Sequence, residues 1–255
     1  MSSDAERVHL EVADGIATIT LDSPQNRNAL SRQLVSELAR SLESSRDDQR
    51  VRAVTLTATG TVFCSGADLT EAANGGGAGG PRFAGVLETI WEFPKPIVVK
   101  LNGHVRAGGL GLVAGADIVV APSDATFAFA EVRIGVAPAM IAVLCMRRMT
   151  PRALGRYLLT GERFDADAAV EAGLVTQAVG RSQLDAVVEG VLDDLRTTEP
   201  KAVAETKALL RDLAELGVTD GLAHAEAVSA RLFASPEAAE GIAAFAQKRQ
   251  PSWQR

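Results

Sequence analysis

The chain has 255 residues, of which 47% are hydrophobic, and a formal net charge of −6 at pH 7. This length allows one large domain or one domain with an appendage, and the hydrophobic content is sufficient for a substantial core. The acidic balance argues against nucleic-acid binding as the main function, because a phosphate backbone is bound by a basic surface.

The two cysteines, Cys64 and Cys145, exclude a disulfide scaffold and are typical of a reducing compartment. The first ten residues are polar and lack the apolar region of a signal peptide. Asp117 and Asp124 interrupt the apolar stretch 110–130, so no transmembrane helix is expected. We therefore expect a cytoplasmic protein without a membrane partner.

The first half of the chain alternates strand and helix patterns. Residues 8–12 and 15–21 predict a β-hairpin that turns at Asp14-Gly15. Ser31 predicts the N-cap of an amphipathic helix that extends to about residue 44. Further strands are predicted at 51–57, 97–101 and 117–121, and further helices at 83–91 and 108–115.

The second half is mostly helical. Helices are predicted at 139–146, at 152–159 after the cap Thr150-Pro151, and at 164–173 between the cap Asp165 and Gly173. A last strand is predicted at 174–179, and the chain from Arg181 to about Pro251 is predicted to be helical. We therefore predict an α/β core over residues 1–190, followed by a helical region over 191–255 that packs on the core or on another subunit.

Two glycine-rich stretches each follow a strand pattern and precede a helix pattern. They are Phe63-Cys64-Ser65-Gly66-Ala67-Asp68-Leu69 and Arg106-Ala107-Gly108-Gly109-Leu110-Gly111-Leu112. The N–H groups at the start of a helix have no partner inside the helix. If the two stretches converge, these groups form an oxyanion hole. Each stretch alone is better explained by close helix–strand packing, and it is their repetition that favours a site.

A single carboxylate, Glu131, follows the second stretch inside the apolar segment 127–134. Burial in this segment would raise its pKa towards a value that is useful for proton transfer. The alternative is a salt bridge with Arg133 or Arg106. An oxyanion hole beside one carboxylate predicts chemistry on a carbonyl compound.

A dinucleotide-binding fingerprint fits the second stretch poorly. Residues 109–115 follow Gly-x-Gly-x-x-x-Gly, which is off pattern. About eight helical residues separate the flanking strands, whereas a parallel crossover within one sheet needs a dozen or more. His104 is interpreted as structural and Cys64 as a packing residue, and the histidines lack the spacing of metal ligands.

Several segments have two interpretations. The glycine run 75–80 is either a flexible surface loop or a mobile wall of a substrate channel. Arg27, Arg82, Lys248 and Arg249 are candidate phosphate contacts, although each alone is typical of a solvated surface charge.

In the order of its motifs, the chain from about residue 8 to 253 resembles the crotonase superfamily, the enoyl-CoA hydratase/isomerase family. The motifs are Arg27-Asn28-Ala29-Leu30, FCSGADL, KPIVVKLNGHVRAGG, ADIVVA, ATFAFAEVRIGVAP, LTGERFDADAAVEAGLV and residues 245–249. The resemblance implies a crotonase-like spiral of repeated ββα units with a C-terminal helical region that forms trimers, often paired into hexamers. It also implies an acyl-CoA substrate and no metal or redox cofactor.

In this family two backbone N–H groups bind the thioester oxygen, and by motif they belong to Ala67 and Gly108. Glu131 matches one of the two glutamates that the hydratases use, whereas Gly111 stands at the position of the other. The GGLGL stretch is similar to that of family members that look like hydratases of branched glutaconyl-CoA thioesters. The carboxylate of such a substrate would fit the space freed at Gly111.

The resemblance thus implies Glu131, Ala67 and Gly108 as catalytic residues, and helix 83–91 as a wall of the acyl pocket. The implied substrate-binding residues are Arg27, Ala29, Ser65, Gly66, Asp68, Leu69, Gly109, Gly111, Phe245 and Lys248. Three functions stay open: a hydro-lyase that adds water to an α,β-unsaturated acyl-CoA, a double-bond isomerase, and a catalytically weak acyl-CoA-binding subunit.

Overall fold

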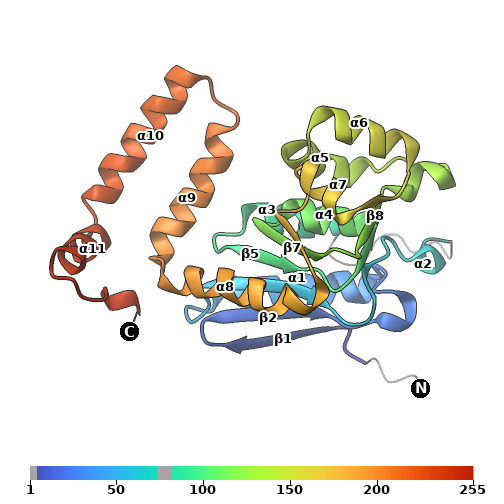
Figure 1. Ribbon diagram of the computed structural model, residues 1–255, viewed down its shortest axis with the longest axis horizontal. Coiled ribbons are helices and arrows are strands. Elements are labelled where there is room, and N and C mark those ends of the chain that lie inside the picture. The colour runs from blue at the N-terminus through green and yellow to red at the C-terminus, as the bar shows by residue number, and fades with distance from the viewer. Residues whose placement is uncertain (1–4, 74–81, 255) are drawn as a thin grey trace.

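The computed structural model describes residues 5–73 and 82–254 as two β-sheets with helices packed around them (Figure 1). The larger sheet has the order β1 (Val8–Ala13), β2 (Ile16–Leu21), β3 (Ala53–Ala58), β5 (Ile97–Lys100), β7 (Ile118–Pro122) and β10 (Gln177–Val179). The smaller sheet has the order β4 (Val62–Cys64), β6 (His104–Arg106), β8 (Thr126–Ala128) and β9 (Phe164–Asp165).

The α-helices of the core are α1 (Arg32–Asp47), α2 (Leu69–Ala73), α3 (Phe83–Glu92), α4 (Gly108–Gly115), α5 (Ala139–Arg148), α6 (Pro151–Thr160), α7 (Ala166–Glu171) and α8 (Leu184–Thr197). They are followed by α9 (Pro200–Leu213), α10 (Val218–Phe233) and α11 (Pro236–Ala246). Short 3-10 helices are η1 (Pro24–Asn26), η2 (Ala130–Ile134), η3 (Arg181–Gln183) and η4 (Ser252–Gln254).

The predicted hairpin is confirmed. Ala13 lies opposite Ile16 in the antiparallel pair of β1 and β2, so the loop has two residues. These residues, Asp14 and Gly15, both have positive φ angles, 48° and 78°. A two-residue hairpin favours this conformation because its twist matches that of the strands, and Asp-Gly adopts it readily.

The other strands of the larger sheet pair in parallel, and their side chains alternate between two apolar cores. In β5, Ile97 and Val99 face the main core, whereas Val98 faces a smaller cluster beneath α8. Helix α8 contributes Leu184, Val188 and Leu192 to this cluster. The predicted core boundary at residue 190 therefore falls inside a helix that covers the sheet.

The smaller sheet is built from strands of two or three residues, which the sequence pattern did not predict. Residues 104–106, between the strand predicted at 97–101 and the helix predicted at 108–115, form strand β6, and the helix expected from residue 164 begins at Ala166, after β9. The cap at Asp165 is confirmed, since its Oδ1 accepts the N–H of Ala168 at 2.9 Å. Such short strands show no period of two, and they form through partners that are distant in sequence.

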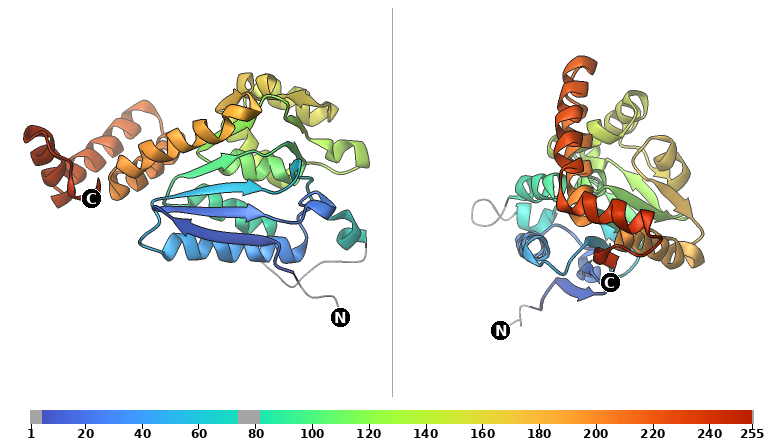
Figure 2. Two further views of the ribbon diagram at one scale, coloured as in Figure 1. Left: turned by 60° about the horizontal axis from the view of Figure 1, so that its bottom comes forward. Right: turned by 90° about the vertical axis from the view of Figure 1, so that its left-hand side faces the viewer.

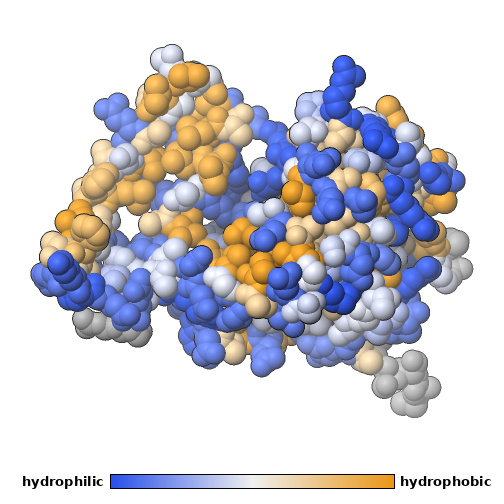
Figure 3. Space-filling model, viewed as in Figure 1, coloured by the Kyte–Doolittle hydropathy of each residue, from blue (hydrophilic) through white to orange (hydrophobic). Residues whose placement is uncertain are grey.

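Helices α9, α10 and α11 form an arm that extends away from the sheets (Figures 1 and 2). Apolar surface covers much of the arm (Figure 3). Its exposed apolar residues are Leu210, Val218, Leu222, Phe233, Ile242 and Phe245. Exposed apolar patches of this kind mark interaction surfaces. Among the described helices, none combines the length and the apolar character needed to cross a bilayer.

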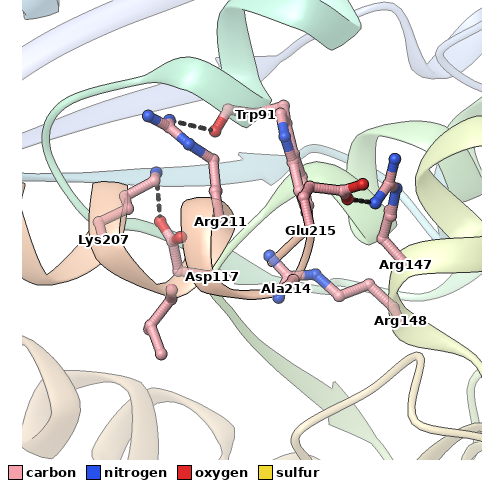
Figure 4. A pocket seen from close by; sticks show the side chains of 9 residues that line it. Trp91, Asp117, Arg147, Arg148, Lys207, Arg211, Ala214 and Glu215 are labelled. Atoms are coloured by element: carbon pink, nitrogen blue, oxygen red, sulfur yellow. Dashed lines mark hydrogen bonds and ion pairs between the residues drawn. The ribbon is translucent and has the colours of Figure 1, made fainter. Parts of the chain in front are cut away.

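A buried ion pair fixes the arm to the core (Figure 4). Lys207 of α9 donates to Asp117 Oδ2 at 2.6 Å, and the same oxygen accepts the N–H of Ile97 at 2.7 Å. Burial lowers the pKa of Lys207, and the carboxylate of Asp117 opposes this shift. One turn later Arg211 donates to the carbonyl of Trp91 at 3.1 Å. The first helix of the arm is therefore held to the core by polar contacts, in which the charge of Asp117 compensates the buried charge of Lys207.

The substitution Asp117→Ala should leave the ammonium group of Lys207 buried without its partner. Loss of one member of a buried pair costs about 3 kcal/mol or more, so we expect the free energy of unfolding to fall by that amount. The control is Asp185→Ala, because Asp185 is 84% exposed in its pair with Lys100 and such pairs contribute about 1 kcal/mol or less. Denaturant unfolding measures both variants, and equal losses would contradict the anchor.

Candidate active site

The two glycine-rich stretches meet. A Cβ atom placed on Gly66 would lie 2.5 Å from the Cβ of Ala107 and 3.2 Å from the backbone nitrogen of Gly108. Gly66 also has a φ angle of 91°, which side chains with a Cβ rarely adopt. The convergence that the sequence predicted is therefore present, and it requires a glycine at position 66.

The first stretch is held by the segment just before α1. The N–H of Leu30 donates to the carbonyl of Gly66 at 2.8 Å, and the N–H of Ser65 donates to the carbonyl of Arg27 at 3.1 Å. Asn28 supports this segment from beneath, because its buried amide donates to the carbonyls of Thr59 and Val62. The sequence indicated Asn28 only as part of a motif. Its structural role could not be predicted because its partners are more than 30 residues away in the chain.

The second stretch turns sharply into α4. Ala107 has φ 47° and ψ −122°, an unusual conformation for a residue with a Cβ, and its N–H donates to the carbonyl of Ala128 at 3.1 Å. Strained residues of this kind cluster at functional sites. Gly108 follows as the first residue of α4, where the helix provides no acceptor for its N–H.

The N–H groups of Ala67 and Gly108 are both available to a ligand. Among the described residues, neither donates a hydrogen bond to the protein. Ala67 is exposed, and Gly108 lies at the positive end of the α4 dipole. Two such donors on converging backbones can stabilise a developing oxyanion.

Glu131 lies in η2 and is half-buried. Its Oε2 atom is buried and has no hydrogen-bond partner among the described residues. Burial raises the pKa of Glu131, an effect that its own backbone N–H partly opposes. Burial also raises the pKa of Cys145 in α5 to about 12, and the charge of Glu131 adds to this shift, so the carboxylate lies near α5.

The alternative salt bridges of Glu131 are not formed. Arg133 donates to the carbonyl of Thr160, and Arg106 donates to Thr126. A half-buried carboxylate with a raised pKa and an unpaired oxygen is suited to accept and return a proton.

Gly111 lies where α4 crosses α3 and α5. A Cβ atom at this position would lie 2.6 Å from Cγ2 of Ile141 and 3.1 Å from Cδ2 of Leu87. The space expected here for a substrate carboxylate is therefore filled by protein side chains. Ile141 lies one turn before Cys145 in α5, on the side of the helix that faces Glu131. Sequence reasoning missed Ile141 because no local pattern links it to Gly111.

The other residues that were expected to bind the substrate differ in their exposure to solvent. Asp68 Oδ1 accepts the N–H of Thr70 at 3.0 Å at the start of α2, and Leu69 is exposed. Ala29 is buried. A Cβ atom placed on Gly109 would lie 2.8 Å from the Cβ of Cys64, so a glycine is needed for this close approach of α4 to β4. These residues shape the two converging loops.

Phe245 and Lys248 do not join the site within one chain. Phe245 lies on α11, which is at the far end of the arm from α4 (Figure 1). Its side chain is 87% exposed. The glycine run 75–80 falls outside the described residues.

A groove of about 460 Å³ runs between α3 and α5. Its lining residues are Ala84, Leu87, Glu88, Trp91, Glu92, Met140, Val143, Leu144 and Arg147. Leu87 and Leu144 also contact the glycines of α4, so the groove lies behind the same helix that begins at Gly108.

The family described as enoyl-CoA hydratase/isomerase matches residues 11–255 of the chain. The chain belongs to this family. The match confirms the predicted membership of the crotonase superfamily, and the chain is an enzyme of the enoyl-CoA hydratase/isomerase type.

Curated relatives and solved structures match this chain over almost its full length. The carnitinyl-CoA dehydratase of Proteus mirabilis is 31% identical, with 98% of each chain covered. The structure of AtuE from Pseudomonas aeruginosa has a TM-score of 0.91 at 36% identity, covering 98% of this chain and 100% of that one. An enoyl-CoA hydratase from Shewanella pealeana has a TM-score of 0.91 at 31% identity, covering 98% and 97%. The predicted α/β crotonase fold is therefore confirmed.

The substitution Gly111→Ala should destabilise the protein by about 1–3 kcal/mol, because the added methyl group overlaps Ile141 in a packed core. Gly190→Ala in α8 is the matched control, since a Cβ there meets no atom within 4 Å. Alanine should stabilise that exposed helical position by about 0.5–1 kcal/mol. Thermal unfolding compares the two variants, and a neutral Gly111→Ala would contradict the contact with Ile141.

Proposed function

We propose that this enzyme is a hydro-lyase that adds water to an α,β-unsaturated acyl-CoA thioester, with one glutamate as its acid–base group. The observation that supports the proposal is the close approach of Gly66 to Gly108, next to which the N–H groups of Ala67 and Gly108 have no acceptor among the described residues. These groups bind the thioester oxygen and stabilise the enolate that forms when the β-carbon is attacked. Loss of one such donor typically costs about 100-fold or more in rate.

Glu131 carries out both proton transfers in the proposed reaction. It takes a proton from water as the oxygen attacks the β-carbon, and it returns a proton to the α-carbon of the enolate. The raised pKa of Glu131 suits this double role, because the carboxylate becomes a stronger base towards water while the carboxylic acid can still return the proton. No metal or redox cofactor is needed for these steps, and coenzyme A enters only as part of the substrate.

Two observations bear on the acyl group. The curated relatives are named carnitinyl-CoA dehydratases, which supports a reaction that exchanges water with an acyl-CoA. The apolar side chains of Leu87, Met140 and Val143 in the groove between α3 and α5 favour an apolar acyl chain there. A branched glutaconyl-CoA stays a prediction from the motif, and the filled space at Gly111 provides no support for it.

An isomerase is the second candidate. A double-bond shift needs one group that moves a proton between two carbons, and the resemblance gives the position of a second glutamate to Gly111, which packs closely against Ile141. The third candidate, a catalytically weak acyl-CoA-binding subunit, has no observation of its own in its favour.

Product analysis separates these functions. The purified protein is incubated with crotonyl-CoA, 3-methylglutaconyl-CoA and a 3-enoyl-CoA, and the products are identified by mass. A water adduct is expected, and the preferred ester names the substrate class. An isobaric product with a shifted double bond would assign an isomerase, and binding without any product would assign the weak binding subunit.

The substitution Glu131→Gln should lower turnover by about 100-fold or more while acyl-CoA binding is retained. The matched control is Glu171→Gln in α7, whose carboxylate is exposed. Steady-state kinetics give the turnover, and direct titration gives the binding. Retained turnover in Glu131→Gln would remove Glu131 from the mechanism.

The same variant has a predicted pH signature in stability. Because burial raises the pKa of Glu131 above 4.5, the ionised carboxylate costs folding free energy, and this cost appears as pH rises through the raised pKa. Glu131→Gln should therefore unfold at a higher temperature than the wild type at neutral pH, and the difference should vanish at acid pH. A variant that is less stable at neutral pH would contradict the unpaired, buried carboxylate.

We also propose a cytoplasmic homotrimer, or a hexamer of two trimers, assembled through the arm. Exposed Leu222 and Phe233 on α10 support this proposal, and Phe245 and Lys248 would then lie at the acyl-CoA site of a partner subunit. Light scattering should give three or six times the chain mass of 26.7 kDa. Leu222→Asp should shift the protein towards monomer, and a monomeric wild type would contradict the assembly.

A further inference from the structure

A second pocket, of about 370 Å³, lies on the face of the smaller sheet that points away from the main core. On β6, His104 and Arg106 line the pocket, whereas Val105 between them is buried in the core. Its described lining residues are Arg27, Val62, Ser65, His104, Arg106, Thr126 and Arg163. This lining holds three arginines and no carboxylate, in a chain whose net charge is −6.

Within the described part of the chain, Arg106 in the lining of the pocket has no ion-pair partner. Arg106 is half-buried and donates to the carbonyl of Val105 at 2.8 Å and to Oγ1 of Thr126 at 2.7 Å. These acceptors are neutral. Burial lowers the pKa of Arg106, and the neighbouring charge of Arg163 lowers it further. The guanidinium group is therefore held in place by bonds that leave its charge uncompensated.

The carboxylates near the pocket are already engaged. Asp124 accepts three hydrogen bonds from Arg181, and Glu162 pairs with Arg156. At the rim, Arg27 and Arg163 are exposed, and within residues 5–73 and 82–254 neither forms an ion pair. Like charges gathered without anions repel each other, so this arrangement favours the binding of an anion from outside.

His104 adds a neutral donor to the pocket. The N–H of Thr126 donates to its Nδ1 at 3.2 Å, so Nδ1 acts as the acceptor and Nε2 carries the proton. Burial and the charges of Arg106 and Arg163 lower the pKa of His104, which keeps the ring neutral near pH 7. The ring can then donate from Nε2 without adding to the repulsion.

We propose that this pocket binds a phosphate group. Guanidinium groups match the geometry of phosphate oxygens and bind them through paired hydrogen bonds, and the lining has three of them beside a histidine donor. The site joins Arg27, a candidate phosphate contact from the sequence, to His104 and Arg106, which the sequence indicated only as structural or as a partner of Glu131. The pocket shares Arg27 and Ser65 with the implied acyl-CoA site, but phosphate binding requires no turnover, so the proposal does not rest on the proposed reaction.

Calorimetric titration of the purified protein with inorganic phosphate tests the site. We expect saturable binding to the wild type and at least about 10-fold weaker binding to Arg163→Ala, since loss of a charge-assisted hydrogen bond weakens binding by about this factor or more. Arg163→Glu should abolish binding, and Arg163→Lys should restore part of it. The control is Arg40→Ala, an exposed arginine on α1 outside the pocket, which should bind as the wild type does.

Competition then identifies the source of the phosphate. If the pocket holds a phosphate of coenzyme A, inorganic phosphate competes with coenzyme A. Dephospho-coenzyme A, which lacks the 3′-phosphate, then competes only if the pocket holds the pyrophosphate. If the pocket holds a free phosphate, inorganic phosphate and coenzyme A bind at the same time. Equal affinity of wild type and Arg163→Glu, or no saturable binding to the wild type, would overturn the proposal. Both results are read without an acyl-CoA substrate, so failure of the proposed reaction would leave them unchanged.

Discussion

The candidate site depends on the contact between two stretches of backbone, at Gly66 and Gly108, where there is no room for a side chain between them. The strained Ala107 is the conformational cost of this contact, on the order of 1–3 kcal/mol, whereas Gly66 adopts its positive φ angle without steric strain. Hydrogen bonds from Leu30 and to Ala128 hold the two turns, and the smaller sheet aligns them. The fold thereby brings together two turns whose N–H groups at Ala67 and Gly108 have no acceptor in residues 5–73 and 82–254.

The local parts of this arrangement were readable from the sequence. The two glycine stretches, the Asp14-Gly15 turn and the Asp165 cap are set by residues within one or two turns of each other, so their signals lie close together in the chain. The short strands of the smaller sheet escaped prediction, because a strand of three residues forms only through its distant neighbours.

Long-range packing was the part that the sequence did not reveal. Gly111 indicated a missing carboxylate, but only the structure shows that Ile141, thirty positions later, fills that space. The pocket around Arg106 joins Arg27 and Arg163, which lie at opposite ends of the core sequence. Helix α11, which carries Phe245, lies far from α4 in one chain (Figure 1), so the predicted role of Phe245 and of the following Lys248 depends on a partner subunit.

Glu131 links the stability of the site to its chemistry. A buried carboxylate oxygen without a partner among the described residues is unfavourable for folding, and the same burial raises the pKa of Glu131, the direction that favours the proposed proton transfer. Ile141 beside Gly111 leaves this side chain as the single carboxylate of the proposed mechanism. Both the hydratase and the isomerase reactions would then proceed through one enolate and one acid–base group.

The most direct test of this account is exchange at the α-carbon of a saturated acyl-CoA in D₂O, followed by mass spectrometry. A saturated thioester can neither add water nor shift a double bond, so the exchange reports only enolate formation at the oxyanion hole and proton transfer by Glu131. We predict that the wild type introduces deuterium at the α-carbon and that Glu131→Gln does not, although both bind the thioester. Binding by the wild type without exchange would contradict the account.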